Sequence, residues 1–102
     1  MSEIPEPEVR VTRYEVSCLP LGHPEYKNFK VIVERHRDGR WSASDGLLAL
    51  TSGGAWVIDP SCVAHRHSEE FALQLARAAA PHVTCNGHTV ADALRDRETP
   101  DA

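Results

Sequence analysis

The chain has 102 residues, 41% of them hydrophobic, and a formal net charge of -4 at pH 7. This length suits one domain with one hydrophobic core, and the mild acidity excludes a strongly basic nucleic-acid binder. Three cysteines at wide spacing argue against a disulfide framework and for a reducing compartment, so we expect a cytoplasmic protein. We expect neither a signal peptide nor a membrane helix, because the chain starts with acidic residues and prolines and has no long apolar run.

The chain divides into three parts. Residues 1–8 are acidic and contain two prolines, so they are predicted to form a disordered or polyproline-type arm. Residues 9–95 should form a single α+β domain. Residues 96–102 are predicted to be a frayed tail, because neither end offers apolar groups that would offset the entropy of ordering.

The first half of the domain predicts strands. Residues 9–18 are rich in β-forming side chains, and a change of phase near Arg13 indicates a bulge or a bend. Residues 19–28 contain two prolines and a glycine and should form a loop. Residues 29–36 then alternate between apolar and polar side chains, which predicts a strand with one buried face.

Turn signals continue this sheet as a meander. Asp38-Gly39 is typical of a two-residue hairpin turn, because glycine tolerates the positive φ that the turn requires. Asp45-Gly46 and the following Ser52-Gly53-Gly54 repeat the turn chemistry. The strands that these turns separate are predicted at residues 40–44, 47–51 and 55–58.

An Ala-rich helix is predicted after the sheet. Ser68 is a good N-cap, two glutamates follow it where the helix dipole favours negative charge, and Pro81 stops the helix. At 100° per residue, Phe71 lies among alanines on the expected core face, and Leu73 lies on the opposite side.

A second, shorter helix is predicted at residues 90–97. Thr89 and Asp92 have the spacing of a capping box at its start. The fold class is therefore α+β, with an antiparallel β-meander of about four to five strands, one Ala-rich helix packed on it and a short C-terminal helix.

Turn and packing residues between about Tyr26 and Leu94 form a set that resembles short uncharacterised proteins of actinobacteria and their phages. The set comprises Gly39-Arg40-Trp41, Ser44-Asp45-Gly46, Gly54, Trp56, Pro60, Ala80-Pro81-His82-Val83-Thr84, Asn86-Gly87 and Thr89. The resemblance carries over no functional residue. It implies a small cytosolic accessory protein, encoded by a phage, that acts by binding a host component.

Cysteine and histidine spacing suggests a metal site as an alternative. Cys62 with His65 and Cys85 with His88 would supply four zinc ligands, but their spacings differ from those of zinc fingers. We therefore predict no metal and no cofactor, with zinc left open. We also predict that the protein is not an enzyme, because the sequence shows no activated nucleophile and no phosphate-binding loop.

The basic hairpin at residues 27–40 suggests nucleic-acid binding as the alternative function, because cationic side chains contact phosphates. Trp41 beside it is more easily explained as a core residue, and arginines at a hairpin tip commonly protect a sheet edge. The residues that would bind nucleic acid are Lys30, Arg35, Arg37 and Arg40.

The predicted function is a small cytosolic protein-interaction module without catalytic activity. Leu73 and Leu47 are expected to expose apolar surface, and the loop with His23 and Tyr26 is a candidate recognition element. The partner would be a host protein or a second copy in a homodimer, because a symmetric contact through a sheet edge would use the same features.

Overall fold

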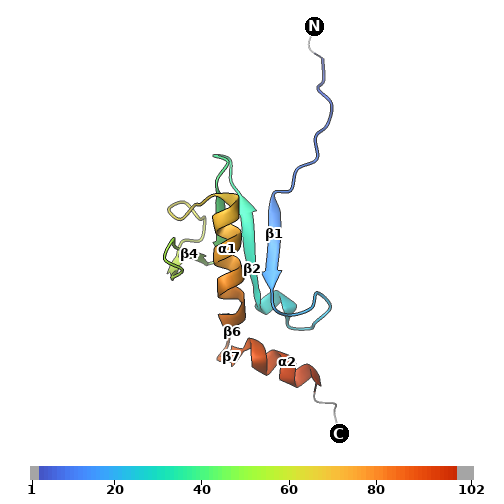
Figure 1. The fold of residues 1–102 in the computed structure, drawn as a ribbon, viewed down its shortest axis with the longest axis vertical. Coiled ribbons are helices and arrows are strands. Elements are labelled where there is room, and N and C mark those ends of the chain that lie inside the picture. The colour runs from blue at the N-terminus through green and yellow to red at the C-terminus, as the bar shows by residue number, and fades with distance from the viewer. Residues whose placement is uncertain (1–2, 99–102) are drawn as a thin grey trace.

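The computed structural model describes residues 3–98 and confirms the predicted α+β class (Figure 1). Residues 1–2 of the predicted arm and 99–102 of the predicted tail lie outside the described residues. Five strands form one antiparallel sheet in which each strand pairs with the next along the chain. These strands are β1 (Arg13–Ser17), β2 (Lys30–Arg35), β3 (Trp41–Ser44), β4 (Leu48–Leu50) and β5 (Trp56–Ile58).

One long helix lies against this sheet, and a smaller unit follows it at the C-terminal end (Figure 1). A short 3₁₀ helix, η1 (Tyr26–Asn28), precedes β2. No helix between residues 3 and 98 is long and apolar enough to cross a membrane. The later elements are α1 (Glu69–Ala79), the 3₁₀ helix η2 (Ala80–His82), β6 (Thr84–Cys85), β7 (His88–Thr89) and α2 (Val90–Glu98).

The β2–β3 turn has its glycine where predicted but is not the predicted two-residue turn, because the His36 N–H donates to the Arg40 carbonyl oxygen at 2.8 Å and leaves three residues between them. Gly39 has φ +82°, and the backbone N–H of Arg40 donates a hydrogen bond to Asp38 at 2.9 Å. The β6–β7 hairpin closes on Asn86 and Gly87, which have φ 52° and 79°. Both central residues of a type I′ turn need positive φ, and asparagine and glycine tolerate it best.

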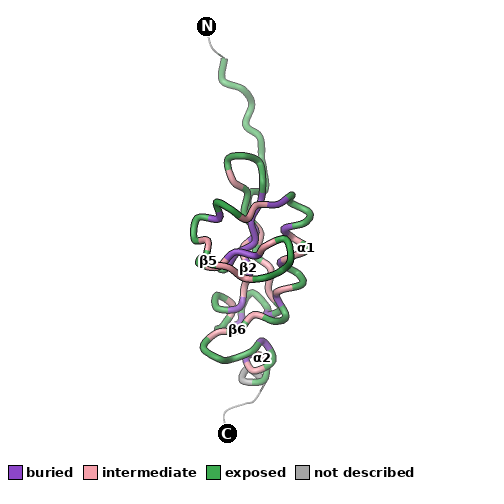
Figure 2. The backbone as a smooth tube through the Cα atoms, turned by 90° about the vertical axis from the view of Figure 1, so that its left-hand side faces the viewer, coloured by how far each residue is buried: buried purple, intermediate pink, exposed green. Residues whose placement is uncertain are grey.

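The main core lies between α1 and the adjacent face of β2 and β3. Alternation along β2 buries every second side chain, as predicted, whereas all four residues of β3 are buried. Small alanines on α1 allow the helix to pack closely. Figure 2 shows buried segments concentrated in the body of the molecule and an exposed N-terminal arm. The buried members of this core are Val31, Val33, Trp41, Ala43, Leu50, Ala72, Ala76 and Ala80.

The helix begins as predicted but is rotated relative to the predicted face. The Ser68 hydroxyl accepts the N–H of Phe71 at 3.2 Å and caps α1. The side of α1 that faces the sheet is centred on Ala72 and Ala76. As a result, Leu73 packs against the core and Phe71 is 36% exposed. The predicted face is therefore confirmed for Ala72, Leu75 and Ala79, and it was wrong for Phe71, Ala78 and Leu73, because the helical wheel was centred on the bulky Phe71 instead of the small residues that fit closest to the sheet.

A second, smaller core joins the loop before β2 to the C-terminal helix. Its buried members are Leu19, Phe29, Val90 and Ala93. The capping box at the start of α2 is confirmed, because the Thr89 hydroxyl accepts the Asp92 N–H and the Asp92 carboxylate accepts the Thr89 N–H. One core was expected, and the structure divides it because η1 and α2 pack beyond the end of the sheet.

The predicted first strand at 9–18 is longer than the strand that forms. β1 begins at Arg13, and residues 3–12 form an exposed segment without helix or strand. Backbone pairing with β2 ends at Thr12, whose carbonyl oxygen accepts the N–H of Arg35 at the end of β2. Residues 9–11 have no strand beside them among the described residues.

Candidate functional site

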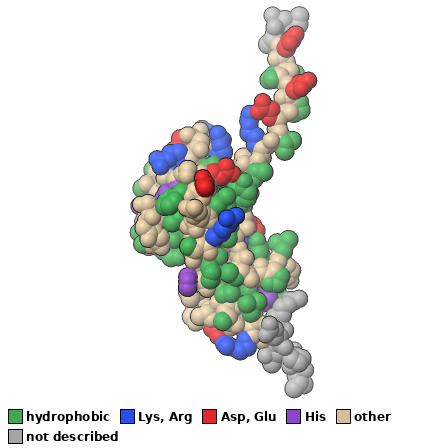
Figure 3. Space-filling model, in the orientation of Figure 1, with side chains coloured by type: hydrophobic (Ala, Val, Ile, Leu, Met, Phe, Trp, Pro, Cys, Tyr) green, Lys and Arg blue, Asp and Glu red, His purple; other side chains and the backbone are tan. Residues whose placement is uncertain are grey.

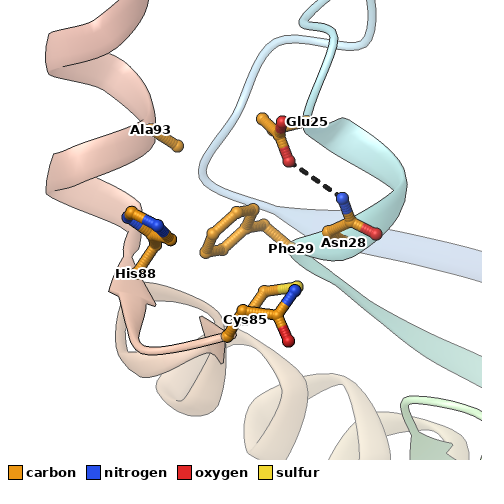
Figure 4. A pocket seen from close by; sticks show the side chains of 7 residues that line it. Glu25, Asn28, Phe29, Cys85, His88 and Ala93 are labelled. Atoms are coloured by element: carbon orange, nitrogen blue, oxygen red, sulfur yellow. Dashed lines mark hydrogen bonds between the residues drawn. The ribbon is translucent and has the colours of Figure 1, made fainter.

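A hollow of about 280 Å³ lies between η1, the β6–β7 hairpin and α2 (Figure 4). Asn28 donates a hydrogen bond to the Glu25 carboxylate at 2.8 Å, and the buried Phe29 ring forms part of the wall of the hollow, between His88 and Asn28 (Figure 4). Cys85 and His88 come from opposite strands of the hairpin, where they are cross-strand partners. The hollow offers polar groups and one thiol, but its carboxylate and amide already bond each other.

The structure does not bring the four proposed zinc ligands together. Cys62 and His65 lie in the loop between β5 and α1, whereas Cys85 and His88 belong to the distant hairpin. Between residues 3 and 98, no three His, Cys, Asp or Glu side chains gather closely enough to hold a metal ion.

The predicted basic residues occupy two separate places. Lys30 begins β2, where its ammonium group donates to the Glu15 carboxylate at 3.0 Å and lies 5.9 Å from the Tyr26 ring centre. Arg13 also bonds Glu15. The Glu15 carboxylate thus offsets the positive charge of Lys30. Lys30 therefore does not belong to the hairpin tip.

The β2–β3 hairpin tip carries the remaining basic residues, and Figure 3 shows Lys or Arg side chains at that end of the body. One member was missed from sequence, because Arg66 reaches the tip from the loop before α1. Arg66 bonds Asp38 at 3.0 Å, and Arg40 donates to the Arg66 carbonyl oxygen at 2.6 Å. The backbone N–H of Arg40 and then the Arg66 guanidinium lower the pKa of Asp38. The cations at the tip are Arg35, Arg37, Arg40 and Arg66.

The predicted recognition loop is tied to the rest of the domain. His23 is buried, and its Nε2 donates to the Ala93 carbonyl oxygen at 3.1 Å while Nδ1 accepts the Glu25 N–H. Tyr26 donates its hydroxyl proton to Glu15 at 3.0 Å and packs on the second core. His23 is thus a structural residue rather than an exposed contact residue.

The two predicted apolar contact residues have different environments. Leu73 is half-buried against the main core, which corrects the expectation that it projects into solvent. Leu47 is exposed, as expected, in the turn that leads into β4. It lies beside β5, because its carbonyl oxygen accepts the N–H of Asp59 at 3.1 Å.

Strand β5 is an edge of the sheet with an unpaired outer side. Asp59 bonds Leu47, Ala55 bonds Thr51, and the register between them pairs Val57 with Ala49. Since hydrogen-bonded residues alternate in an antiparallel ladder, the N–H and C=O groups of Trp56 and Ile58 point away from β4. No described residue bonds them. An added strand could bond four backbone groups, namely the N–H and C=O groups of Trp56 and Ile58.

Two hollows lie beside this edge, on the face of the sheet that carries α1. Trp56 and His82 line both of them. The first, of about 170 Å³, has Leu48 and Val83 in its wall and Asp45 at its rim. The second, of about 300 Å³, is lined also by Gly54, Leu75, Ala78 and Ala79. Both exist because α1 packs mainly on β2 and β3 and leaves the side chains of β4 and β5 partly uncovered.

Apolar side chains are also exposed around the end of β5. Leu47, Ile58 and Val63 are 57%, 75% and 68% exposed. Asp59 connects the three backbone segments, because its N–H donates to the Leu47 carbonyl oxygen and its carboxylate accepts the Val63 N–H at 3.1 Å. Burial raises the pKa of Asp59, but backbone N–H groups from Ala64, Val63 and His65 bring it below its ordinary value. We call the outer side of β5, the two hollows and these three side chains the β5 edge.

Comparisons with protein-family models, with curated proteins and with solved structures found no match to this chain. The resemblance to actinobacterial and phage proteins therefore stays a prediction.

Proposed function

We propose that this chain is a non-catalytic protein-interaction module that binds an extended segment of a partner protein along β5. The single observation that carries the proposal is the unpaired backbone of Trp56 and Ile58 next to two hollows. Strand addition supplies affinity through backbone hydrogen bonds and specificity through pockets for alternate side chains.

The chemistry of the edge defines the segment it would accept. Side chains alternate between faces along a strand, so every second residue of an added strand points toward the α1 side. Those residues meet Trp56, Leu48 and the exposed Ile58, which favour apolar side chains. A half-buried tryptophan between two hollows is a typical anchor of an interface. The favoured ligand is an extended peptide with apolar residues at alternate positions.

The proposal is tested by selecting peptides from a displayed random library on the wild-type protein and following binding by NMR. We expect the amide signals of Trp56 and Ile58 to shift and to become protected from exchange. Ile58→Lys should weaken binding about tenfold, because a charge on an edge strand opposes strand addition. The matched control is Leu21→Lys, which places the same charge on an equally exposed apolar site elsewhere. Equal binding by Ile58→Lys, or selection of no peptide, overturns the proposal.

Nucleic-acid binding at the hairpin tip is the second candidate. Two observations favour it. Arg66 lies at the tip beside the three arginines predicted from sequence. Arg35 and Arg37 have no ion-pair partner within residues 3–98. Trp41 is buried and cannot stack on a base, so this mode would rest on phosphate contacts alone. Arg35→Glu combined with Arg37→Glu should abolish a salt-sensitive mobility shift, whereas Arg77→Glu should retain it. No shift of the wild-type protein at low salt excludes this candidate.

A further inference from the structure

The segment that precedes β1 has a strand-like sequence without a strand beside it. Val9 and Val11 alternate with polar residues, and they are 100% and 57% exposed. β-branched residues with this period are typical of strands, and solvated valines contribute no stability. Figure 3 shows the arm leaving the body with apolar side chains between acidic ones. Among residues 3–98 no strand lies opposite Val9 and Val11, because β2 ends at Arg35 opposite Thr12.

No strand of the described part of the chain pairs with the outer side of β1. β1 is the edge of the sheet opposite β5. The Thr12–Arg35 hydrogen bond fixes which residues of β1 face β2, namely Thr12, Tyr14 and Val16. In an antiparallel ladder the intervening residues therefore point their N–H and C=O groups outward. These outward residues are Val11, Arg13, Glu15 and Ser17.

We propose that β1 and the segment before it pair with the same strand of a second copy, antiparallel and about a two-fold axis at Tyr14. Outward residues can pair only with outward residues, so the axis must pass through a residue position and not between two. Centring it on Arg13 would place Arg13 opposite itself, and centring it on Glu15 would place two carboxylates together. Like charges directly opposite are destabilising in a sheet.

The register centred on Tyr14 is electrostatically self-complementary. Arg13 then lies opposite the second copy's Glu15, and Glu15 lies opposite the second copy's Arg13. Opposite charges at facing positions stabilise a strand pair, and symmetry supplies the contact twice. Centring on Thr12 would instead pair Arg13 with a valine and would forgo both contacts.

The same register extends the ladder into the arm. Val11 meets the second copy's Ser17, and Thr12 meets the second copy's Val16. The exposed residues before β1 thereby become part of a strand, which accounts for the predicted strand at 9–18. The two sheets join into one, with both copies of α1 on the same face. This contact uses the edge opposite β5, so it is independent of the proposed function.

The experiment is sedimentation of the full chain over a range of concentrations with a charge-swap series. Arg13→Glu and Glu15→Arg should each raise the dimer dissociation constant about tenfold, because each variant creates two like-charge contacts. The combined Arg13→Glu, Glu15→Arg variant restores opposite charges in this register and should recover dimerisation. A wild-type chain that stays monomeric, or a double variant as weak as the single variants, overturns the proposal.

Two further variants separate loss of the dimer from loss of the fold and from contacts at the β5 edge. Val11→Asp lies in the exposed arm outside the folded body, so it should weaken the dimer and leave the thermal unfolding of a diluted monomer unchanged. Ile58→Lys should leave the dimer intact, which separates this contact from the β5 edge. A dimer that survives Val11→Asp and fails with Ile58→Lys would place the contact on β5 and refute the inference.

Discussion

The Tyr14 hydroxyl in β1 donates a hydrogen bond to the Glu69 carboxylate in the first turn of α1, at 2.6 Å. The Tyr14 ring also lies 5.6 Å from the ring of Trp41 in the main core. The outer strand is therefore tied to the helix as well as to β2. The hydrogen bond to Glu69, then burial, then the carboxylate charge raise the pKa of Tyr14 above 10.0.

Glu69→Gln should lower the pKa of Tyr14, because it removes the charge that favours the protonated phenol. An ultraviolet titration in a Tyr26→Phe background isolates the signal. A folded pKa above the unfolded value means that the contribution to stability is complete below pH 10 and is lost as pH rises through the folded pKa. An unchanged pKa in Glu69→Gln would contradict the contact between Tyr14 and Glu69.

Lys30→Met should raise the pKa of Glu15 from about 2 toward its ordinary value of 4.5. Hydrogen bonds from Lys30, then Arg13, then Tyr26 stabilise the carboxylate. Because the folded pKa is depressed, the stabilisation is complete above pH 4.5 and is lost as pH falls toward 2. NMR titration of the side-chain carboxyl carbon checks the shift. Arg10→Met, whose guanidinium pairs with Glu8, should leave it unchanged.

His67→Ala should lower the free energy of unfolding by about 1–3 kcal/mol, the cost of leaving a buried polar group unpaired. Nε2 of the buried His67 donates to the Leu50 carbonyl oxygen at 3.0 Å, and its ring packs edge-on against Phe71. Urea unfolding measures the change. The half-buried His65 provides the control, and an equal loss in His65→Ala would argue against a specific role for His67.

Ala76→Leu should destabilise the fold by about 1–3 kcal/mol, because overfilling a packed core forces shifts in its neighbours. Ala76 is fully buried between α1 and the sheet. Gln74→Leu on the exposed side of the same helix should change stability by less than about 0.5 kcal/mol. If thermal unfolding ranks the two variants in the opposite order, the helix orientation is incorrect.

Local signals were sufficient for most of the fold. The positive φ of Gly39, the Ser68 cap and the alternation in β2 are each decided by residues close in sequence, so they could be predicted, whereas the loop at Asp38-Gly39 is one residue longer than predicted. The orientation of α1 could not be, because it depends on which residue approaches the sheet most closely.

The candidate site was only partly predictable. Leu47 was identified as exposed, but the β5 edge arises from pairing among separated segments, and its hollows depend on where α1 lies. His23 was assigned to a free loop because its buried contact, the Ala93 carbonyl, is 70 residues away. The segment before β1 was predicted as a strand from composition, yet a strand also needs a neighbour to pair with.

Val83 packs against both hydrophobic cores. The C-terminal unit of β6, β7 and α2 has its own core, which contacts the main core at Val83 and joins the loop before β2, together with the His23 hydrogen bond to Ala93. Such an arrangement divides the domain into cooperative units that open separately. We expect amide protons in α2 to exchange with solvent by a local opening, at lower free energy than those of β2 and β3, which exchange when the whole sheet unfolds.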